Sequence, residues 1–143
     1  RLNLKEIRNL QWQAPPVDLL VLSACTTALG NPQAELGFVG LALQSGVKSA
    51  LGSLWRVSDL GTMALMSEFY WQLKAKSFKA KALQEAQMKM INGEIVLSGG
   101  ELQVSRGAIA VEDELLDEFL TVGNPELSHP YYWASFSLIG NPF

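Results

Sequence analysis

Cys25 is the only cysteine of the chain, and it stands where a short apolar run gives way to a turn-forming segment. Residues 18–25 are almost continuously apolar, which is typical of a buried strand. In open parallel α/β sheets, catalytic groups gather at the carboxyl ends of strands. This position makes Cys25 a candidate nucleophile, whereas an unpaired cysteine taken alone is more typical of a small buried hydrophobe.

The residues around Cys25 narrow the chemistry that it can perform. A cysteine phosphatase needs an arginine six residues further on, where this chain has Asn31. A nucleophile elbow needs glycines two residues to either side, where Ser23 and Thr27 stand. A redox pair or a cysteine-rich zinc site needs further cysteines. A Cys–His hydrolase remains, in which imidazole deprotonates the thiol and protonates the leaving amine.

The only histidine, His129, lies far along the chain and directly before Pro130. This position is typical of a polar residue at the start of a strand. The spacing therefore does not pair His129 with Cys25 as its base.

The elements expected to position Cys25 alternate in type. Continuous apolar residues predict strands over 18–25 and 47–55, and helical spacing predicts helices over 38–46, 57–76 and 79–93. This alternation predicts an α/β fold, with a parallel sheet between helices.

The helix over 57–76 has the clearest signals, because Ser58 or Asp59 can cap its start. Its expected apolar face consists of Leu60, Met63, Ala64, Met66, Phe69, Tyr70 and Leu73.

Residues 93–127 break the alternation and predict an insertion on the α/β unit. Gly99–Gly100 favours a hairpin, and an acidic amphipathic helix is expected within 111–124. The apolar and aromatic residues of 129–143 predict one more buried strand.

Composition excludes several classes of protein. A net charge of −3 without a basic cluster argues against nucleic-acid binding. The presence of a single cysteine favours a reducing, cytoplasmic setting. No apolar run is long enough to predict a membrane span. The start "RLNLKEIRNL" has neither Met nor a signal-peptide pattern, so we expect the chain to be part of a longer protein.

Four blocks of the sequence match one family pattern in order. They read "DLLVLSACTTALG", "ELGFVGLALQSGVKSALGSLWRVSD", "FYWQL" and "HPYYWASFSLIGNPF". In these blocks the chain resembles the CHAT domain, a caspase-like cysteine peptidase family of clan CD. That family is related to separase and is often found after TPR repeats in bacterial proteins.

The resemblance implies the caspase-hemoglobinase fold, an α/β/α sandwich with a mostly parallel sheet flanked by helices. Residues 1–143 would form the carboxy-terminal, Cys-bearing portion of a single such domain. Cys25 lies in the nucleophile motif. The family's catalytic histidine belongs to an upstream Thr-His-Gly motif that this sequence lacks, so the partners expected are that upstream part, TPR repeats and a protein substrate.

The stretch "LWRVSD" resembles a Leu-Trp-x-Val-Thr-Asp segment of the separase group, whose Asp is associated with recognising a basic residue before the scissile bond. Asp59 occupies the matching position, so the resemblance implies that Asp59 binds the substrate. Trp55 would form a wall of the same pocket. The caspase preference for aspartate does not transfer readily, because Ser23-Ala24-Cys25-Thr26 departs from the caspase nucleophile motif.

The function expected is a cysteine endopeptidase that cleaves a protein substrate after a basic residue and needs no metal or organic cofactor. The alternative is a catalytically inactive scaffold in which the acidic segment 112–118 docks a partner. A nucleotide site at "GFVGLALQSG" is disfavoured, since the spacing fits neither G-x-G-x-x-G nor a Walker loop.

Overall fold

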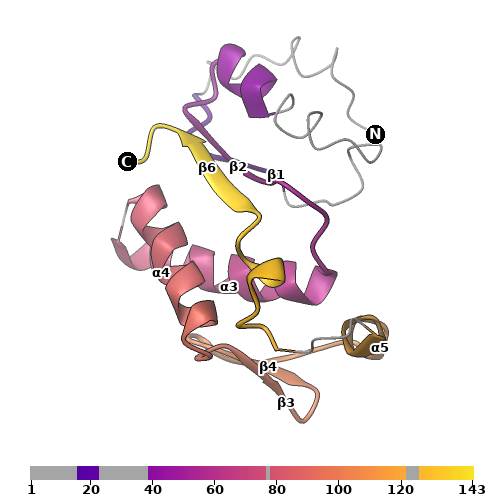
Figure 1. The fold of residues 1–143 in the computed structure, drawn as a ribbon. Coiled ribbons are helices and arrows are strands. Elements are labelled where there is room, and N and C mark those ends of the chain that lie inside the picture. The colour runs from indigo at the N-terminus through magenta and orange to yellow at the C-terminus, as the bar shows by residue number, and fades with distance from the viewer. Residues whose placement is uncertain (1–15, 23–38, 77, 122–125) are drawn as a thin grey trace. The chain divides into compact units, whose positions relative to one another are not determined.

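The structure, a computed structural model, describes four stretches of the chain: residues 16–22, 39–76, 78–121 and 126–143 (Figure 1). The chain divides into two compact units. The first takes residues 1–56 and 136–142, and the second takes residues 57–135 and Phe143.

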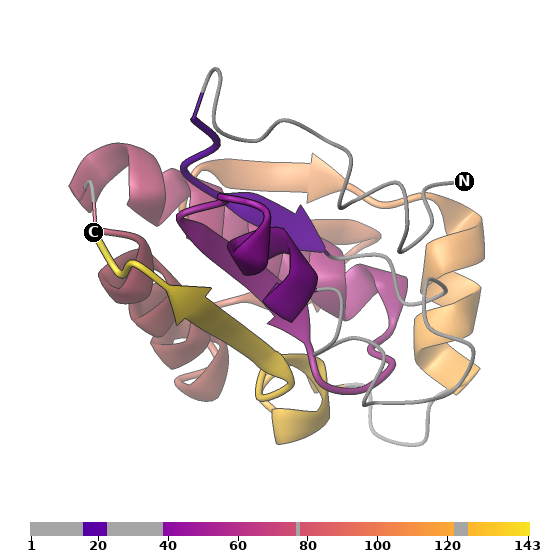
Figure 2. The same ribbon diagram turned by 90° about the horizontal axis from the view of Figure 1, so that it is seen from above.

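The first unit contains a three-stranded sheet in the order β1-β2-β6, with β2 in the middle (Figures 1 and 2). Strand β1 (Leu20–Leu22) runs parallel to β2 (Ser49–Ser53), and β6 (Phe136–Gly140) runs antiparallel to β2. The predicted α/β class is therefore confirmed. Of the two described pairings one is parallel and one antiparallel, so the mostly parallel caspase-like sheet stays a prediction.

The three strands of this sheet differ in how deeply their residues are buried. Every residue of β2 is buried, as expected of a central strand. Leu20–Leu22 are only half-buried, and of β6 only Phe136 is fully buried. The expectation that both outer strands are fully buried is therefore wrong for their described residues. Among the described strands, β1 and β6 each pair only with β2, so one side of each strand has no described neighbour.

Residues 39–44 are helical and pack closely on β2. The approach depends on Gly52, where an added Cβ would lie 3.1 Å from Val39 Cγ2. The segment ends as predicted at Gly46, whose φ of +105° is the left-handed conformation that glycine adopts at a helix end.

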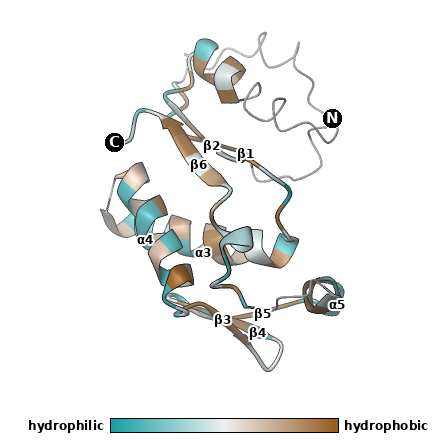
Figure 3. Cartoon of the chain, viewed as in Figure 1, coloured by the Kyte–Doolittle hydropathy of each residue, from teal (hydrophilic) through white to brown (hydrophobic). Residues whose placement is uncertain are grey.

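The second unit begins with α3 (Asp59–Lys76) and α4 (Lys79–Ile91), close to the predicted bounds. Asn92 caps the end of α4 and Gly93 follows with a φ of +67°. Helix α4 contains both apolar and charged residues, so both colours appear on it in Figure 3. The core of this pair of helices is made by Leu60, Ala64, Leu65, Phe69, Ala82, Leu83, Ala86 and Met90.

One part of the predicted face of α3 is wrong. Tyr70 was expected in the core, but half of its surface is exposed, whereas the side chain of Glu68 is fully buried. The helix therefore places a carboxylate where its apolar spacing predicted only hydrophobic side chains.

Residues 96–110 form a three-stranded antiparallel sheet of β3 (Val96–Ser98), β4 (Glu101–Val104) and β5 (Gly107–Ala110). The hairpin predicted at Gly99–Gly100 is confirmed, with φ values of +60° and +78° that suit a two-residue β-turn. The third strand was not predicted.

The predicted acidic helix is α5 (Asp113–Thr121), and the short 3₁₀ helix η1 (Pro130–Tyr132) follows it. The rings of Phe119 and Tyr132 lie 5.3 Å apart. Tyr132 also packs against α3 at Gly61, where an added Cβ would come 2.7 Å from the ring. Tyr132 is therefore a contact between η1 and both helices.

Candidate active site

Three strand ends meet at one edge of the sheet in the first unit. The register sets Leu22 of β1 beside Gly52 of β2, and Phe136 of β6 beside Ser53. Because β1 and β2 are parallel, their carboxyl ends share this edge, and the amino end of β6 joins them. Cys25 follows Leu22 by three residues and lies outside the described residues.

Trp55 follows β2 at the same edge and is 38 % exposed. It belongs to the first unit, whereas Asp59 belongs to the second. A part-exposed indole can contact a ligand with its ring face. The role of Trp55 as a pocket wall stays a prediction.

Asp59 is the first residue of α3 and is exposed. The cap of this helix is Ser58, whose buried Oγ accepts a hydrogen bond of 3.1 Å from the Gly61 N–H. The Ser58 carbonyl accepts a second bond from the Thr62 N–H at 3.0 Å. Of the two residues predicted as caps, Ser58 takes the role, and the Asp59 carboxylate is not needed for it. An acidic group at a helix start is also stabilised by the helix dipole.

His129 is the cap of η1, and its Nδ1 accepts a hydrogen bond of 3.2 Å from the Tyr131 N–H. The imidazole is exposed and belongs to the second unit. Its observed contact is therefore structural. The expectation that His129 begins a strand is wrong, because a 3₁₀ helix starts there and β6 begins only at Phe136.

The model of the CHAT-domain family matches residues 1–141. The chain belongs to the CHAT family. This family is associated with caspase-like cysteine peptidase folds. The matched range includes the first three sequence blocks and all of the fourth except Pro142 and Phe143. Comparison with curated proteins and with solved structures found no match.

Within the described part of this CHAT domain, no three His, Cys, Asp or Glu side chains come together as metal ligands. The described residues also contain no helix that is both long and apolar enough to cross a membrane.

The second unit of the CHAT domain holds a buried polar cluster that the sequence did not reveal. Gln72 Nε2 donates to Glu68 Oε1 at 2.7 Å, and the Ser105 N–H donates to Glu68 Oε2 at 3.1 Å. Lys89 Nζ lies 3.7 Å from Glu68 Oε1 and 2.5 Å from Ser105 Oγ. One carboxylate thus joins α3, α4 and the turn between β4 and β5.

These contacts decide the charge of Glu68. Burial by itself raises the pKa of its carboxyl, but the hydrogen bonds from Gln72 and Ser105 and the charge of Lys89 outweigh burial. The pKa therefore lies below its ordinary value, and Glu68 is ionised at neutral pH.

We expect Glu68→Ala to lower the free energy of unfolding by about 3 kcal/mol, because it leaves the Gln72 amide and the Ser105 N–H without their acceptor. The measurement is denaturant unfolding of the full-length protein. Glu94→Ala is the matched control, since Glu94 also faces Lys89, at 3.6 Å, but is half exposed. An exposed pair contributes at most about 1 kcal/mol. Equal losses in the two variants would contradict the role given to Glu68.

The lowered pKa of Glu68 also predicts a pH dependence. Its stabilisation is fully present above the unfolded-state pKa, about 4.3, and is lost as the pH falls through the lower folded-state value. The unfolding free energies of wild type and Glu68→Gln, measured as a function of pH, should therefore differ by a constant amount above about pH 5 and converge in acid. A difference that grows as the pH falls would show that the sign is wrong.

Proposed function

We propose that this CHAT domain is a cysteine endopeptidase of the caspase and separase type, with Cys25 as its nucleophile. The single observation that supports this most is the parallel pair β1 and β2, whose carboxyl ends share one edge. Cys25 and Trp55 follow these two strands in the sequence, within a chain that belongs to a peptidase-associated family. Catalytic groups of parallel α/β sheets collect at such an edge.

The proposed reaction has two steps. The Cys25 thiolate attacks the carbonyl carbon of the peptide, the C–N bond breaks, and the leaving amine takes a proton from a histidine. Water, deprotonated by the same histidine, then hydrolyses the thioester and restores the thiol. Hydrogen-bond donors aimed at the oxyanion lower the barrier, and removal of one such donor in a serine protease costs roughly 3–4 kcal/mol.

We propose that the histidine comes from the part of the domain upstream of this sequence. The role of His129 supports this, because its Nδ1 is engaged as the cap of η1. An unassisted thiol is mostly protonated at neutral pH. Residues 1–143 alone should therefore cleave peptides slowly.

For the substrate we propose a basic residue before the scissile bond, held by Asp59. Since Ser58 performs the capping, the exposed Asp59 carboxylate is available to a guanidinium, which it can bind through two parallel charged hydrogen bonds. The role of Trp55 in substrate binding rests on the sequence resemblance and on its part-exposed indole, which can contact an apolar part of a substrate.

A scaffold without catalysis is the second candidate, and the surface of α5 favours it. Helix α5 and the residue before it expose a run of carboxylates: Glu112, Asp113, Glu114, Asp117 and Glu118. Such a surface can dock a basic partner whether or not Cys25 reacts.

The test is cleavage of fluorogenic peptides by the full-length protein, with the residue before the scissile bond varied. Turnover of Arg or Lys peptides supports the peptidase, and its complete absence across the set supports the scaffold. The variant His129→Asn retains an acceptor for the Tyr131 N–H, so turnover should persist if the base lies elsewhere. Loss of turnover in a folded His129→Asn protein would instead assign the base to His129.

A further inference from the structure

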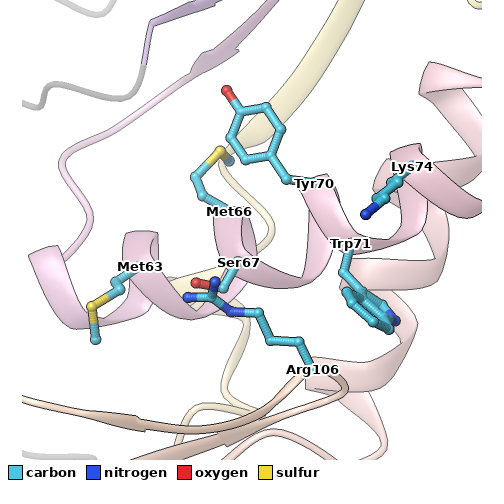
Figure 4. A pocket seen from close by; sticks show the side chains of 7 residues that line it. All are labelled: Met63, Met66, Ser67, Tyr70, Trp71, Lys74 and Arg106. Atoms are coloured by element: carbon cyan, nitrogen blue, oxygen red, sulfur yellow. The ribbon is translucent and has the colours of Figure 1, made fainter.

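A groove runs along α3, lined wholly by residues of the second unit, and we call it the Trp71 groove (Figure 4). Its helical wall carries the apolar side chains of Met63, Met66, Tyr70 and Trp71. Met63, Met66 and Tyr70 recur at intervals of three and four residues along one side of the helix, and Trp71 adjoins Tyr70. Tyr70 and Trp71 are 50 % and 44 % exposed, which is unusual for side chains of this size.

The facing wall is Arg106, in the turn between β4 and β5. This turn is fixed to α3, because the neighbouring Ser105 N–H donates to the buried Glu68 carboxylate. In Figure 4 the Arg106 side chain extends from the turn along α3, with its guanidinium toward Ser67. The groove is thus built from two elements that a buried charge holds together.

The groove has the size of a ligand site. Its volume is about 430 Å³, within the range found for specific pockets. An α-helix rises about 1.5 Å per residue, so the wall from Met63 to Lys74 is roughly 16 Å long. An extended peptide of about five residues covers that distance.

The charge of the groove selects its ligand. Lys74 lies at one end and Arg106 along the opposite wall, and no acidic side chain is among the described residues that line it. Among the described residues, neither cation forms an ion pair or a hydrogen bond. Two exposed cations beside a strip of methionine and aromatic side chains complement a ligand that carries carboxylates next to an apolar group. Methionine side chains adapt to the shape of such a group.

We propose that the Trp71 groove docks an acidic peptide segment of a partner protein, with an aliphatic or aromatic side chain against the apolar residues of α3 and carboxylates on Lys74 and Arg106. The net charge of −3 for the whole chain disfavours a long polyanion such as a nucleic acid, whereas a short acidic segment meets only the local positive charge. This docking role does not depend on whether Cys25 is catalytic.

The test is fluorescence anisotropy of the full-length protein with a labelled short peptide that has glutamates around two leucines. Its partner probe has glutamine in place of every glutamate. We expect the acidic peptide to bind, the amide peptide to bind at least tenfold more weakly, and Arg106→Ala and Lys74→Ala each to weaken acidic-peptide binding about tenfold. The control Lys81→Ala removes an exposed lysine of α4 outside the groove and should leave the affinity unchanged.

Four outcomes would overturn the proposal: no peptide binding, equal affinity for both peptides, wild-type affinity in both groove variants, or tighter binding of a single-stranded oligonucleotide. Trp71→Ala supplies the apolar test and should also lower the affinity, with circular dichroism confirming that the variant is folded. Because aromatic contacts are less sensitive to salt than ion pairs, added salt should weaken wild-type binding more than that of Arg106→Ala.

Discussion

Peptide cleavage by the full-length protein is expected to fall at least about ten-thousandfold when Cys25 is replaced by alanine, because alanine has no sulfur to form the thioester. The measurement is kcat/KM on an Arg-containing fluorogenic peptide. The unfolding midpoint should change little, since the substitution removes a single sulfur atom from a small side chain. Loss of activity in a stable variant is what separates a nucleophile from a core residue.

Cys25→Ser is the matched control for this experiment. Serine keeps nearly the same shape but is a much weaker nucleophile without a base tuned to it, so it should be almost as inactive as alanine. Alkylation with iodoacetamide should inactivate the wild type, and a peptide substrate should slow that inactivation. Cys25→Ala protein that retains wild-type turnover would remove Cys25 from the mechanism.

Elements with strong local signals were predicted from the sequence. The start of α3 is specified by Ser58, whose side chain completes the first turn, and the end of α4 by Asn92 and Gly93. The hairpin at Gly99–Gly100 is equally local, because both glycines supply the positive φ that the turn requires. In each case the determining residues lie within a few positions of the feature.

Features that depend on distant contacts were not predicted. The apolar spacing of α3 places Tyr70 inward and gives no reason to bury Glu68, yet the structure does the opposite. The Glu68 carboxylate is stabilised in the core only because Lys89 and the Ser105 N–H reach it from other elements. Strand β5 was missed for a related reason, since its short Gly-Ala-Ile-Ala sequence is a strand only through its pairing with β4.

The strands that precede the candidate site residues were predicted, whereas the roles of those residues stay predictions. The apolar runs indicated two strands ending near Cys25 and Trp55, and the parallel register of β1 and β2 is what gives those ends a common edge. The sequence left the choice of cap between Ser58 and Asp59 open, because either side chain can accept a bond from the first turn. The Trp71 groove needed the structure, since Arg106 joins α3 only through the fold of residues 96–110.

Asp59→Ala is expected to remove the preference for arginine before the scissile bond and to leave the bond-breaking chemistry intact. A carboxylate that holds a guanidinium through two charged hydrogen bonds discriminates by about a hundredfold against a neutral side chain. The ratio of kcat/KM for matched Arg and Gln peptides should therefore approach one in the variant. The kcat/KM for the Gln peptide should stay near its wild-type value, because Asp59 takes no part in attack on the carbonyl.

Ser58→Ala is the control that separates substrate recognition from helix capping. It removes the acceptor of the Gly61 N–H and should lower the free energy of unfolding by about 1 kcal/mol, while the preference for arginine persists. Asp59→Asn keeps the shape and removes the charge, so it should lose most of the preference. If Asp59→Ala keeps the wild-type ratio of kcat/KM for the Arg and Gln peptides, the exposed carboxylate at the start of α3 does not recognise the substrate. A basic preference must then come from another acidic side chain.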